Sequence, residues 1–155
     1  PVLFIIENNK YGMGTDIRRT TSIDHLWKRA LSFDMGHSDV DGMNVLAVQE
    51  HVSGIVETMR KDKKPHLLEA LTYRYRGHSV SDPGTYRTKQ EVEDYQKNKD
   101  PIKQLAKHLV EKKFSTEDEL KSFDKDAKEI VKEAEAFADE SPNPPVEELW
   151  DHVLV

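Results

Sequence analysis

The feature that most constrains the fold is the apolar run at residues 2–6, Val-Leu-Phe-Ile-Ile, which begins almost at the first residue. Its residues are apolar at odd and even positions alike, which is typical of a strand buried on both faces of a sheet. Such a strand needs neighbours, and a domain rarely begins with one. We therefore expect further sequence upstream of Pro1.

A helix and a second strand are expected further along the chain. Asn44 is a candidate N-cap for a helix that carries apolar residues at helical spacing, namely Val45, Val48, Val52, Ile55, Val56 and Met59. Residues 66–73 then predict a second strand, and the order strand, helix, strand favours parallel pairing. A shorter helix is expected after Ser22, and residues 33–42 are expected to form a loop.

Residues from 89 onward are rich in Lys and Glu and predict helices. Their candidate N-terminal signals are Thr88 with Glu91 as a capping box, Asp100 followed by Pro101, and Ser115. We therefore expect residues 1–88 to form part of a parallel-sheet α/β domain with flanking helices. Residues 89–155 are expected to be a helical extension of that domain.

Bulk composition excludes several classes of function. The formal net charge of −6 gives no support for nucleic-acid binding, which needs a basic face. The longest apolar run, residues 2–6, is far too short to cross a bilayer, so no membrane association is expected. There is no cysteine, so the chain has no disulfide and no thiolate metal site, which fits a reducing compartment.

Two polar loops that contain glycine follow the predicted strands, at the ends where parallel sheets bind ligands. The first, residues 7–15, contains the pair Asn8 and Asn9 and the segment Tyr-Gly-Met-Gly. Amide and backbone carbonyl oxygens are ligands suited to Mg²⁺. Asn and Gly are also the commonest turn residues, so spacing alone favours a simple turn. A metal ion here would need a ligand from elsewhere, because only Glu7 and Asp16 supply carboxylates nearby.

The second loop, residues 73–88, brings three arginines, one histidine, two serines and an Asp-Pro-Gly turn into 16 positions. Arginine side chains suit phosphate or carboxylate recognition. A histidine among them can donate a hydrogen bond or carry a proton near neutral pH. Composition alone favours a solvated basic loop. A phosphate on Ser79 would lie near Arg74 and Arg76, so Ser79 is also a candidate phosphorylation site.

Several segments of the chain, in the same order along the sequence, resemble those of the alpha subunits of thiamine-diphosphate-dependent 2-oxo acid dehydrogenases (E1), most closely the pyruvate type. Residues 7–15 are similar to the closing half of the family's thiamine diphosphate motif, whose Gly-Asp-Gly half is expected roughly 30 residues upstream. Further similar segments are residues 40–44, 73–79, 86–88, 100–102 and 144–149. The resemblance implies part of a thiamine-diphosphate-binding fold with thiamine diphosphate and Mg²⁺ as cofactors.

The resemblance also implies roles for the first loop. The side chain of Asn9 and the backbone carbonyl of Tyr11 are expected to ligate Mg²⁺. Gly12 and Met13 belong to the same cofactor-binding segment, and Met13 is expected to pack under the cofactor and hold its bent form. The alternative for Met13 is ordinary core filling.

In the second loop, the resemblance implies that His78 reaches toward the cofactor diphosphate and the reacting centre. His78 is therefore the expected catalytic residue, with Arg74 and Arg87 ordering the loop around it. Ser79 stands at the position that mitochondrial relatives phosphorylate. Compared with those relatives, this sequence is one residue shorter after Gly84 and lacks their second loop serine. This difference argues against the same regulation.

The implied reaction is decarboxylation of pyruvate, followed by transfer of the acetyl group to the lipoyl domain of the E2 component. The expected partners are an E1 beta subunit in an α2β2 heterotetramer and that lipoyl domain. These 155 residues alone are expected to be inactive. Two alternatives stay open: a branched-chain 2-oxo acid or acetoin dehydrogenase E1 alpha subunit, and a non-catalytic subunit-interaction domain. The expected location is a bacterial cytoplasm, with a mitochondrial matrix as the alternative.

Overall fold

A computed structural model describes residues 1–151 and 153 of the chain. It forms two compact units, Pro1–His108 and a second that begins at Leu109. The first unit contains the sheet and both polar loops, and the second is helical. The α/β fold with a helical C-terminal region is thus confirmed, whereas the division at residue 88 stays a prediction.

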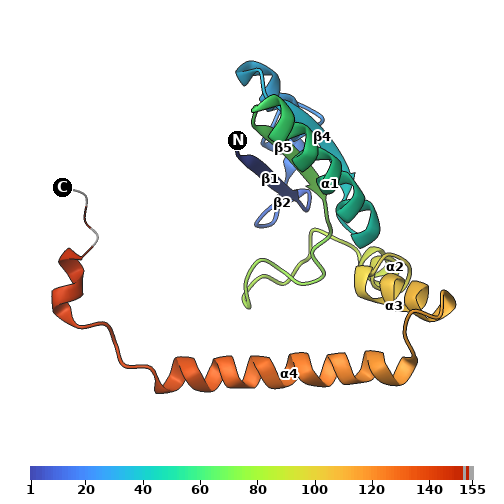
Figure 1. The fold of residues 1–155 in the computed structure, drawn as a ribbon, viewed down its shortest axis with the longest axis vertical. Helices are drawn as coiled ribbons and strands as arrows, with labels where there is room; N and C mark the ends of the chain where they lie inside the picture. The colour runs from blue at the N-terminus through green and yellow to red at the C-terminus, as the bar shows by residue number, and fades with distance from the viewer. Residues whose placement is uncertain (152, 154–155) are drawn as a thin grey trace. The chain divides into compact units, whose positions relative to one another are not determined.

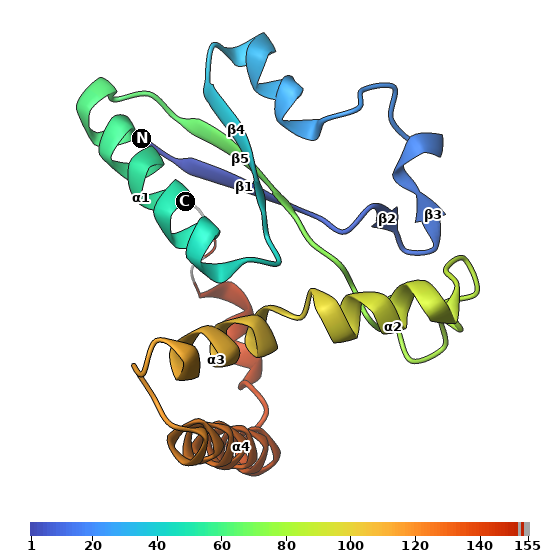
Figure 2. The same ribbon diagram turned by 90° about the vertical axis from the view of Figure 1, so that its right-hand side faces the viewer.

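The sheet of the first unit has three parallel strands in the order β1-β5-β4 (Figure 2). They are β1 (Leu3–Asn8), β5 (His66–Leu71) and β4 (Gly36–Asp41). Leu71 at the end of β5 is in register with Asn8 of β1 and with Asp41 of β4. All three strands therefore end at one edge of the sheet, which is where the two polar loops leave it.

Helix α1 (Val45–Asp62) covers one face of the sheet (Figures 1 and 2). Its buried residues Ile55 and Met59 pack with Val40 of β4 and Leu68 of β5 in the core. The predicted N-cap is confirmed, because the side chain of Asn44 accepts a 3.1 Å hydrogen bond from the backbone N–H of Ala47.

The opposite face of the sheet carries the 3₁₀ helix η2 (Leu26–Phe33), whose buried residue is Ala30. A helix was predicted here, but its predicted start at Ser22 is wrong, since η2 begins after His25 and has no side-chain cap. Neighbouring residues of a strand point to opposite faces. Leu68 therefore faces α1, and Leu67 and Glu69 face η2.

Two predictions about the strands are wrong. Residues 33–42 were expected to be a loop, but they contain β4, an edge strand held by parallel pairing with β5. Burial of the first strand on both faces was also expected, yet Phe4 is 49% exposed and Ile5 is 59% exposed. Within the described residues β1 is the other edge of the sheet, so only part of its apolar surface is covered.

The remaining helices begin close to their predicted caps. The Thr88 side chain accepts a hydrogen bond from the N–H of Glu91 at the start of α2 (Lys89–Asn98). The Asp100 side chain accepts two hydrogen bonds, from the N–H groups of Ile102 and Lys103, at the start of α3 (Pro101–Glu111). A capping box between Thr116 and Glu119, one residue later than the predicted start at Ser115, opens α4 (Glu117–Glu140).

The second unit consists chiefly of α4 and the short 3₁₀ helix η3 (Val146–Trp150). Apolar side chains along α4 are exposed, including Phe123, Ile130, Val131 and Phe137. Among the residues that the structure describes, no helix combines the length and hydropathy needed to cross a bilayer.

Candidate functional site

The first polar loop forms a small hairpin directly after β1. Strands β2 (Tyr11–Gly12) and β3 (Thr15–Asp16) pair antiparallel, and we call residues 9–16 the hairpin loop. Met13 lies at its tip in the left-handed conformation with φ of 55°, and its side chain is 65% exposed. The exposed tip therefore presents Met13 to its surroundings and does not bury it in this unit's core.

Two side-chain amides hold the base of the hairpin loop. The Asn8 oxygen accepts a 2.9 Å hydrogen bond from the N–H of Lys10, and the Asn9 oxygen accepts a 3.1 Å bond from the N–H of Tyr11. These are the side-chain turns that Asn forms readily. They fix the backbone that carries Asn9 and Tyr11, the two predicted metal ligands.

Asn9 and Tyr11 line a cleft of about 900 Å³ that extends from the hairpin loop to α2. The acidic side chains of the cleft are Asp16, Asp24, Asp41 and Glu91. Its basic side chains are Lys10, Arg18 and Lys99. The cleft thus carries side chains of both charges, and it lies at the edge where the strands of the sheet end.

The donor types at Asn9 and Tyr11 fit a divalent hard cation. An amide oxygen has two lone pairs, so Asn9 can bind an ion while it accepts from Tyr11, and the Tyr11 carbonyl is a second neutral oxygen ligand. No group of three or more His, Asp or Glu side chains among the described residues could hold a metal ion. The loop therefore supplies only part of a coordination shell, and other ligands must complete it.

Within the second polar loop, residues 74–87 fold around Asp82, and we call these residues the arginine loop. One carboxylate oxygen of Asp82 accepts hydrogen bonds from the N–H of His78 (2.7 Å) and the hydroxyl of Tyr86 (2.9 Å). The other accepts from the N–H of Gly84 at 2.8 Å. The backbone bonds, from His78 first and then Gly84, lower the pKa of Asp82.

The arginine loop contacts the hairpin loop directly. Arg74 donates hydrogen bonds to the backbone carbonyl of Met13 (2.7 Å) and to the hydroxyl of Tyr86 (3.0 Å). The rings of Tyr11 and Tyr86 lie 4.8 Å apart between centroids. A Cβ at Gly14 would come within 3.1 Å of the Tyr86 ring, so glycine permits this close approach. The structure therefore brings the two predicted site loops together.

Arg87 is buried beneath this contact. Its guanidinium donates to the backbone carbonyls of Arg74 and Arg76, the latter at 3.0 Å. The same group lies 5.1 Å from the ring centroid of Tyr86, 5.2 Å from that of Tyr73 and 5.9 Å from that of Tyr11. One planar cation thus binds the start of the arginine loop and three aromatic rings.

Tyr73 connects the end of β5 to α2. Its ring stacks on Tyr95 with centroids 3.8 Å apart, and its hydroxyl donates to the Glu91 carboxylate at 3.1 Å. Burial, followed by the hydrogen bond to Glu91, raises the pKa of Tyr73 to about 12. Tyr73 therefore stays neutral and donating through the physiological range.

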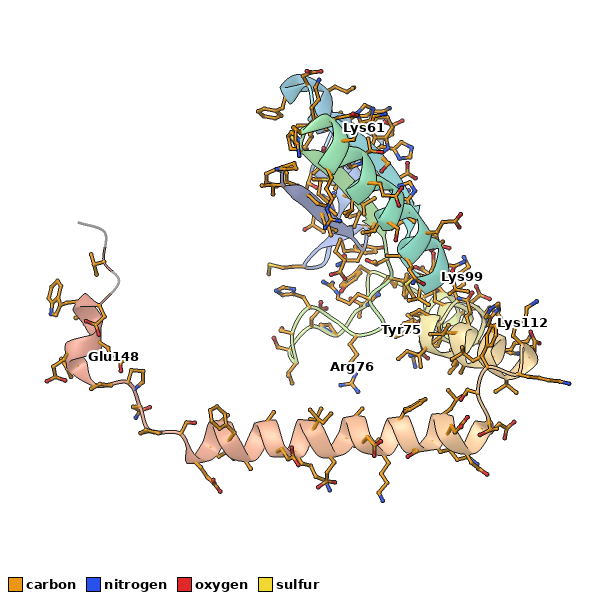
Figure 3. The ribbon with its side chains drawn as sticks, viewed as in Figure 1. Lys61, Tyr75, Arg76, Lys99, Lys112 and Glu148 are labelled. Carbon is orange, nitrogen blue, oxygen red and sulfur yellow. The ribbon has the colours of Figure 1, made fainter. Side chains whose placement is uncertain are left out.

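The predicted catalytic and regulatory residues are exposed on the arginine loop. His78 and Ser79 are both exposed, and the Ser79 hydroxyl lies 3.0 Å from that of Ser81. Arg76 extends away from the sheet (Figure 3). Among the described residues, no hydrogen bond joins His78 to Asn9, so the two loops meet through Arg74 and Tyr86.

Sequence reasoning missed three residues of this site, Glu69, Asp82 and Tyr73. Glu69 is 0% exposed and accepts a 2.5 Å hydrogen bond from the Asn8 side chain and a 3.1 Å bond from the N–H of Trp27. A single acid inside the apolar strand at residues 66–71 was the available signal for Glu69. An Asp before Pro-Gly signalled a side-chain turn at Asp82.

Comparison with known proteins places these features in a family. The family described as "Dehydrogenase E1 component" matches residues 1–147. The pyruvate dehydrogenase E1 component subunit alpha of Rhizobium meliloti is 44% identical over 155 residues, which are 100% of this chain and 44% of that protein. The subunit of the same name from Rickettsia bellii is 43% identical, over 100% of this chain and 47% of that protein.

A plant relative shows the same similarity. The chloroplastic pyruvate dehydrogenase E1 component subunit alpha-3 of Oryza sativa is 40% identical over 99% of this chain and 36% of that protein. The chain spans about half the length of the curated relatives that it matches.

Proposed function

The chain belongs to the dehydrogenase E1 component family, and from this premise we propose that it is part of the alpha subunit of a pyruvate dehydrogenase E1. The proposed reaction is decarboxylation of pyruvate with thiamine diphosphate and Mg²⁺, followed by transfer of the acetyl group to a lipoyl domain. Identity of 38–44% to subunits with this name, over the whole chain, favours pyruvate over branched-chain 2-oxo acids or acetoin.

The observation that carries the proposal is the contact between the two loops at the end of the sheet. The hairpin loop holds the two neutral oxygen ligands, and the arginine loop is tied to its tip by Arg74. Parallel sheets bind ligands at this edge. A phosphate-bearing cofactor placed there would meet oxygen ligands from one loop and positive charge from the other.

Within this arrangement each predicted residue has a proposed task. When bound, thiamine diphosphate supplies the carbon nucleophile that pyruvate decarboxylation requires. Asn9 and the Tyr11 carbonyl would hold part of the Mg²⁺ shell, Gly12 would let the backbone of the hairpin loop approach the cofactor, and exposed Met13 would pack against it. Arg74 and Arg87 hold the arginine loop in place.

His78 is the proposed catalytic residue. Its exposed imidazole can donate a hydrogen bond to a diphosphate oxygen and can act as a general acid or base. Asp82 fixes the backbone beneath it, because the N–H of His78 donates to that carboxylate. The backbone that carries the imidazole is therefore held by Asp82, and the ring itself is exposed to a ligand.

The proposed partners are an E1 beta subunit, in an α2β2 heterotetramer, and the lipoyl domain of an E2 component. Relatives named as E1 component subunits support a multisubunit enzyme. A bacterial cytoplasm is the proposed location, supported by the bacterial relatives, although a chloroplastic relative exists. Ser79 is a proposed phosphorylation site, because it is exposed next to His78. A phosphate on Ser79 would repel an anionic substrate.

The test uses the full-length protein that carries this chain, purified together with its partner subunit. His78→Ala is expected to lower kcat for pyruvate by roughly 10²-fold or more, as loss of a general acid–base group does. Its thiamine diphosphate affinity should change much less. The control is His108→Ala, which alters a histidine of α3 outside both loops. A His78→Ala enzyme with wild-type kcat would refute the catalytic role.

Substrate specificity separates the rival functions. The wild-type assembly is assayed with pyruvate, branched-chain 2-oxo acids and acetoin, and its affinity for thiamine diphosphate with Mg²⁺ is measured by calorimetry. The proposal predicts the highest kcat/KM for pyruvate. Preference for another substrate would replace the proposed substrate, and absence of cofactor binding would favour a non-catalytic interaction domain.

A further inference from the structure

Glu69 is a buried carboxylate without a cationic partner among its hydrogen bonds. It lies at the centre of β5, between Leu68 and Ala70, and is 0% exposed. One carboxylate oxygen accepts a 2.5 Å hydrogen bond from the Asn8 side-chain nitrogen, and the other accepts a 3.1 Å bond from the N–H of Trp27. Glu69 therefore links the end of β1 and the start of η2 to the central strand.

The two partners of Glu69 can only donate. The Trp27 group is a backbone N–H. The orientation of the Asn8 amide is set by its other end, because its oxygen accepts from the N–H of Lys10 at 2.9 Å. Only its nitrogen can then face Glu69. The position therefore requires an acceptor at both oxygens, which a carboxylate provides and the amide of glutamine does not.

A buried carboxylate is costly, because burial removes it from water. Hydrogen bonds to an ionised acceptor are about twice as strong as neutral ones, and they hold their donors firmly. Glu69 thus fixes the geometry of Asn8 more tightly than a neutral group would.

Asn8 passes this constraint to the predicted metal ligands. Its side chain holds the N–H of Lys10, and its carbonyl accepts a 3.0 Å hydrogen bond from the N–H of Thr72 at the end of β5. Lys10 takes the left-handed conformation with φ of 70°, which a lysine rarely adopts. Asn9 lies between these two restrained residues. The contacts of Asn8 therefore restrict the backbone from which the Asn9 side chain projects.

We propose that Glu69 is a positioning residue, which acts through Asn8 to hold Asn9 and Tyr11 in the geometry that binds the divalent ion of the cofactor. This inference rests on the proposed function, since it needs a metal ion at Asn9. Residues that orient metal ligands typically change metal affinity by 10–100-fold when they are replaced. Glu69→Gln is expected to fall in that range.

The experiment uses the full-length protein with its partner subunit, thiamine diphosphate, and Mn²⁺ in place of Mg²⁺. Electron paramagnetic resonance measures the Kd of Mn²⁺, and hydrogen exchange measures protection of the Lys10 amide. Glu69→Gln should raise the Kd by roughly tenfold or more and expose the Lys10 amide to exchange. The matched control is Val40→Ala, a truncation in the core on the other face of the sheet. It should lower Tm and leave the Kd within about twofold.

A double-mutant cycle tests whether the effect passes through Asn8. Asn8→Ala should raise the Kd as Glu69→Gln does, and the double variant should be little worse than either single variant. Additive effects, or a Glu69→Gln Kd within about twofold of wild type, would overturn the inference. If Glu69→Gln fails to fold, Asn8→Ala decides alone, and an unchanged Kd overturns it. A wild-type assembly that binds no Mn²⁺ would instead refute the proposed function.

Discussion

The guanidinium of Arg74 donates a 2.7 Å hydrogen bond to the backbone carbonyl of Met13, 61 residues earlier in the chain. It joins two loops that the sequence alone shows only as separate polar segments. Because Met13 is at the exposed tip of the hairpin loop, this bond sets the distance between the tip and the arginine loop. Several consequences of this junction can be measured.

Removal of the Arg74 side chain should loosen the junction. Arg74→Gln loses a charged donor to Met13 and Tyr86, which at a partly exposed site should cost about 1 kcal/mol. We expect roughly fivefold weaker thiamine diphosphate binding, measured by calorimetry on the full-length assembly. Arg76→Gln is the control, since Arg76 is exposed (Figure 3). Equal effects of the two variants would show that only net charge matters.

Replacement of Arg87 by lysine should be harmful although the charge is kept. Lysine cannot reach two carbonyls and stack on three rings with one planar group. The loss should be about 1–3 kcal/mol of loop stability, seen as faster proteolytic cleavage within residues 74–87. Arg19→Lys, in an exposed 3₁₀ turn, provides the comparison. Cleavage of Arg87→Lys at the wild-type rate would contradict the role assigned to the Arg87 guanidinium.

Ionised Asp82 should keep the arginine loop ordered across neutral and mildly acidic pH. Its pKa is lowered in the folded state, so its contribution is present above the unfolded pKa, about 3.9, and is lost as pH falls through the lower folded value. Hydrogen exchange of the His78 and Gly84 amides should therefore show constant protection from pH 8 to about pH 5. Asp82→Asn should lose this protection at pH 7, whereas Asp126→Asn on exposed α4 should not. Protection that falls between pH 7 and 5 would argue for another titrating group.

Acid should weaken the packing of α1 through His66. The His66 ring nitrogen lies 2.9 Å from the Ser38 hydroxyl, to which His51 also comes within 2.9 Å. Burial first, then the charges of His37 and His51, lower the pKa of His66. Glu50 of α1 lines the same pocket. The folded state thus binds the proton less readily than the unfolded state, so stability is full above about pH 6.5 and falls as pH drops below it.

Hydrogen exchange of α1 amides, corrected for intrinsic rates, provides the measurement for His66. Wild-type protection should fall between pH 7 and 5, and His66→Gln should flatten this dependence. His108→Gln removes a histidine of α3 that is outside the cluster and should leave the dependence unchanged. A His66→Gln profile identical to wild type would contradict the role assigned to His66.

Periodicity and capping signals predicted the elements that depend on local sequence. The apolar stripe of α1 and its Asn44 cap are encoded by residues only a few positions apart in the sequence, and the parallel pairing of β1 with β5 follows from the crossover. Strand β4 was missed because Gly36–Asp41 is mostly polar. It is a strand only because backbone groups of β5 pair with it, and side-chain patterns do not report that pairing.

The candidate site was predicted in part. The resemblance gave the two loops and the residues Asn9, Tyr11, Gly12, Met13, Arg74, His78, Ser79 and Arg87, whose roles stay predictions. The contacts that hold these loops involve Asp82, Tyr86 and Glu69, which come from distant positions or from turns. Such partners depend on the tertiary fold, so no pattern in one sequence could have identified the Asn8–Glu69 bond.

The exposed apolar side chains of β1 have a practical consequence for handling this polypeptide. Within the described residues one edge of β1 has no neighbouring strand, and Phe4 and Ile5, which point to opposite faces of that strand, are each about half exposed. Open strand edges with apolar side chains recruit strands from other molecules. Purified alone at high concentration, the polypeptide should self-associate and precipitate, and a charged substitution such as Ile5→Lys should keep it dispersed.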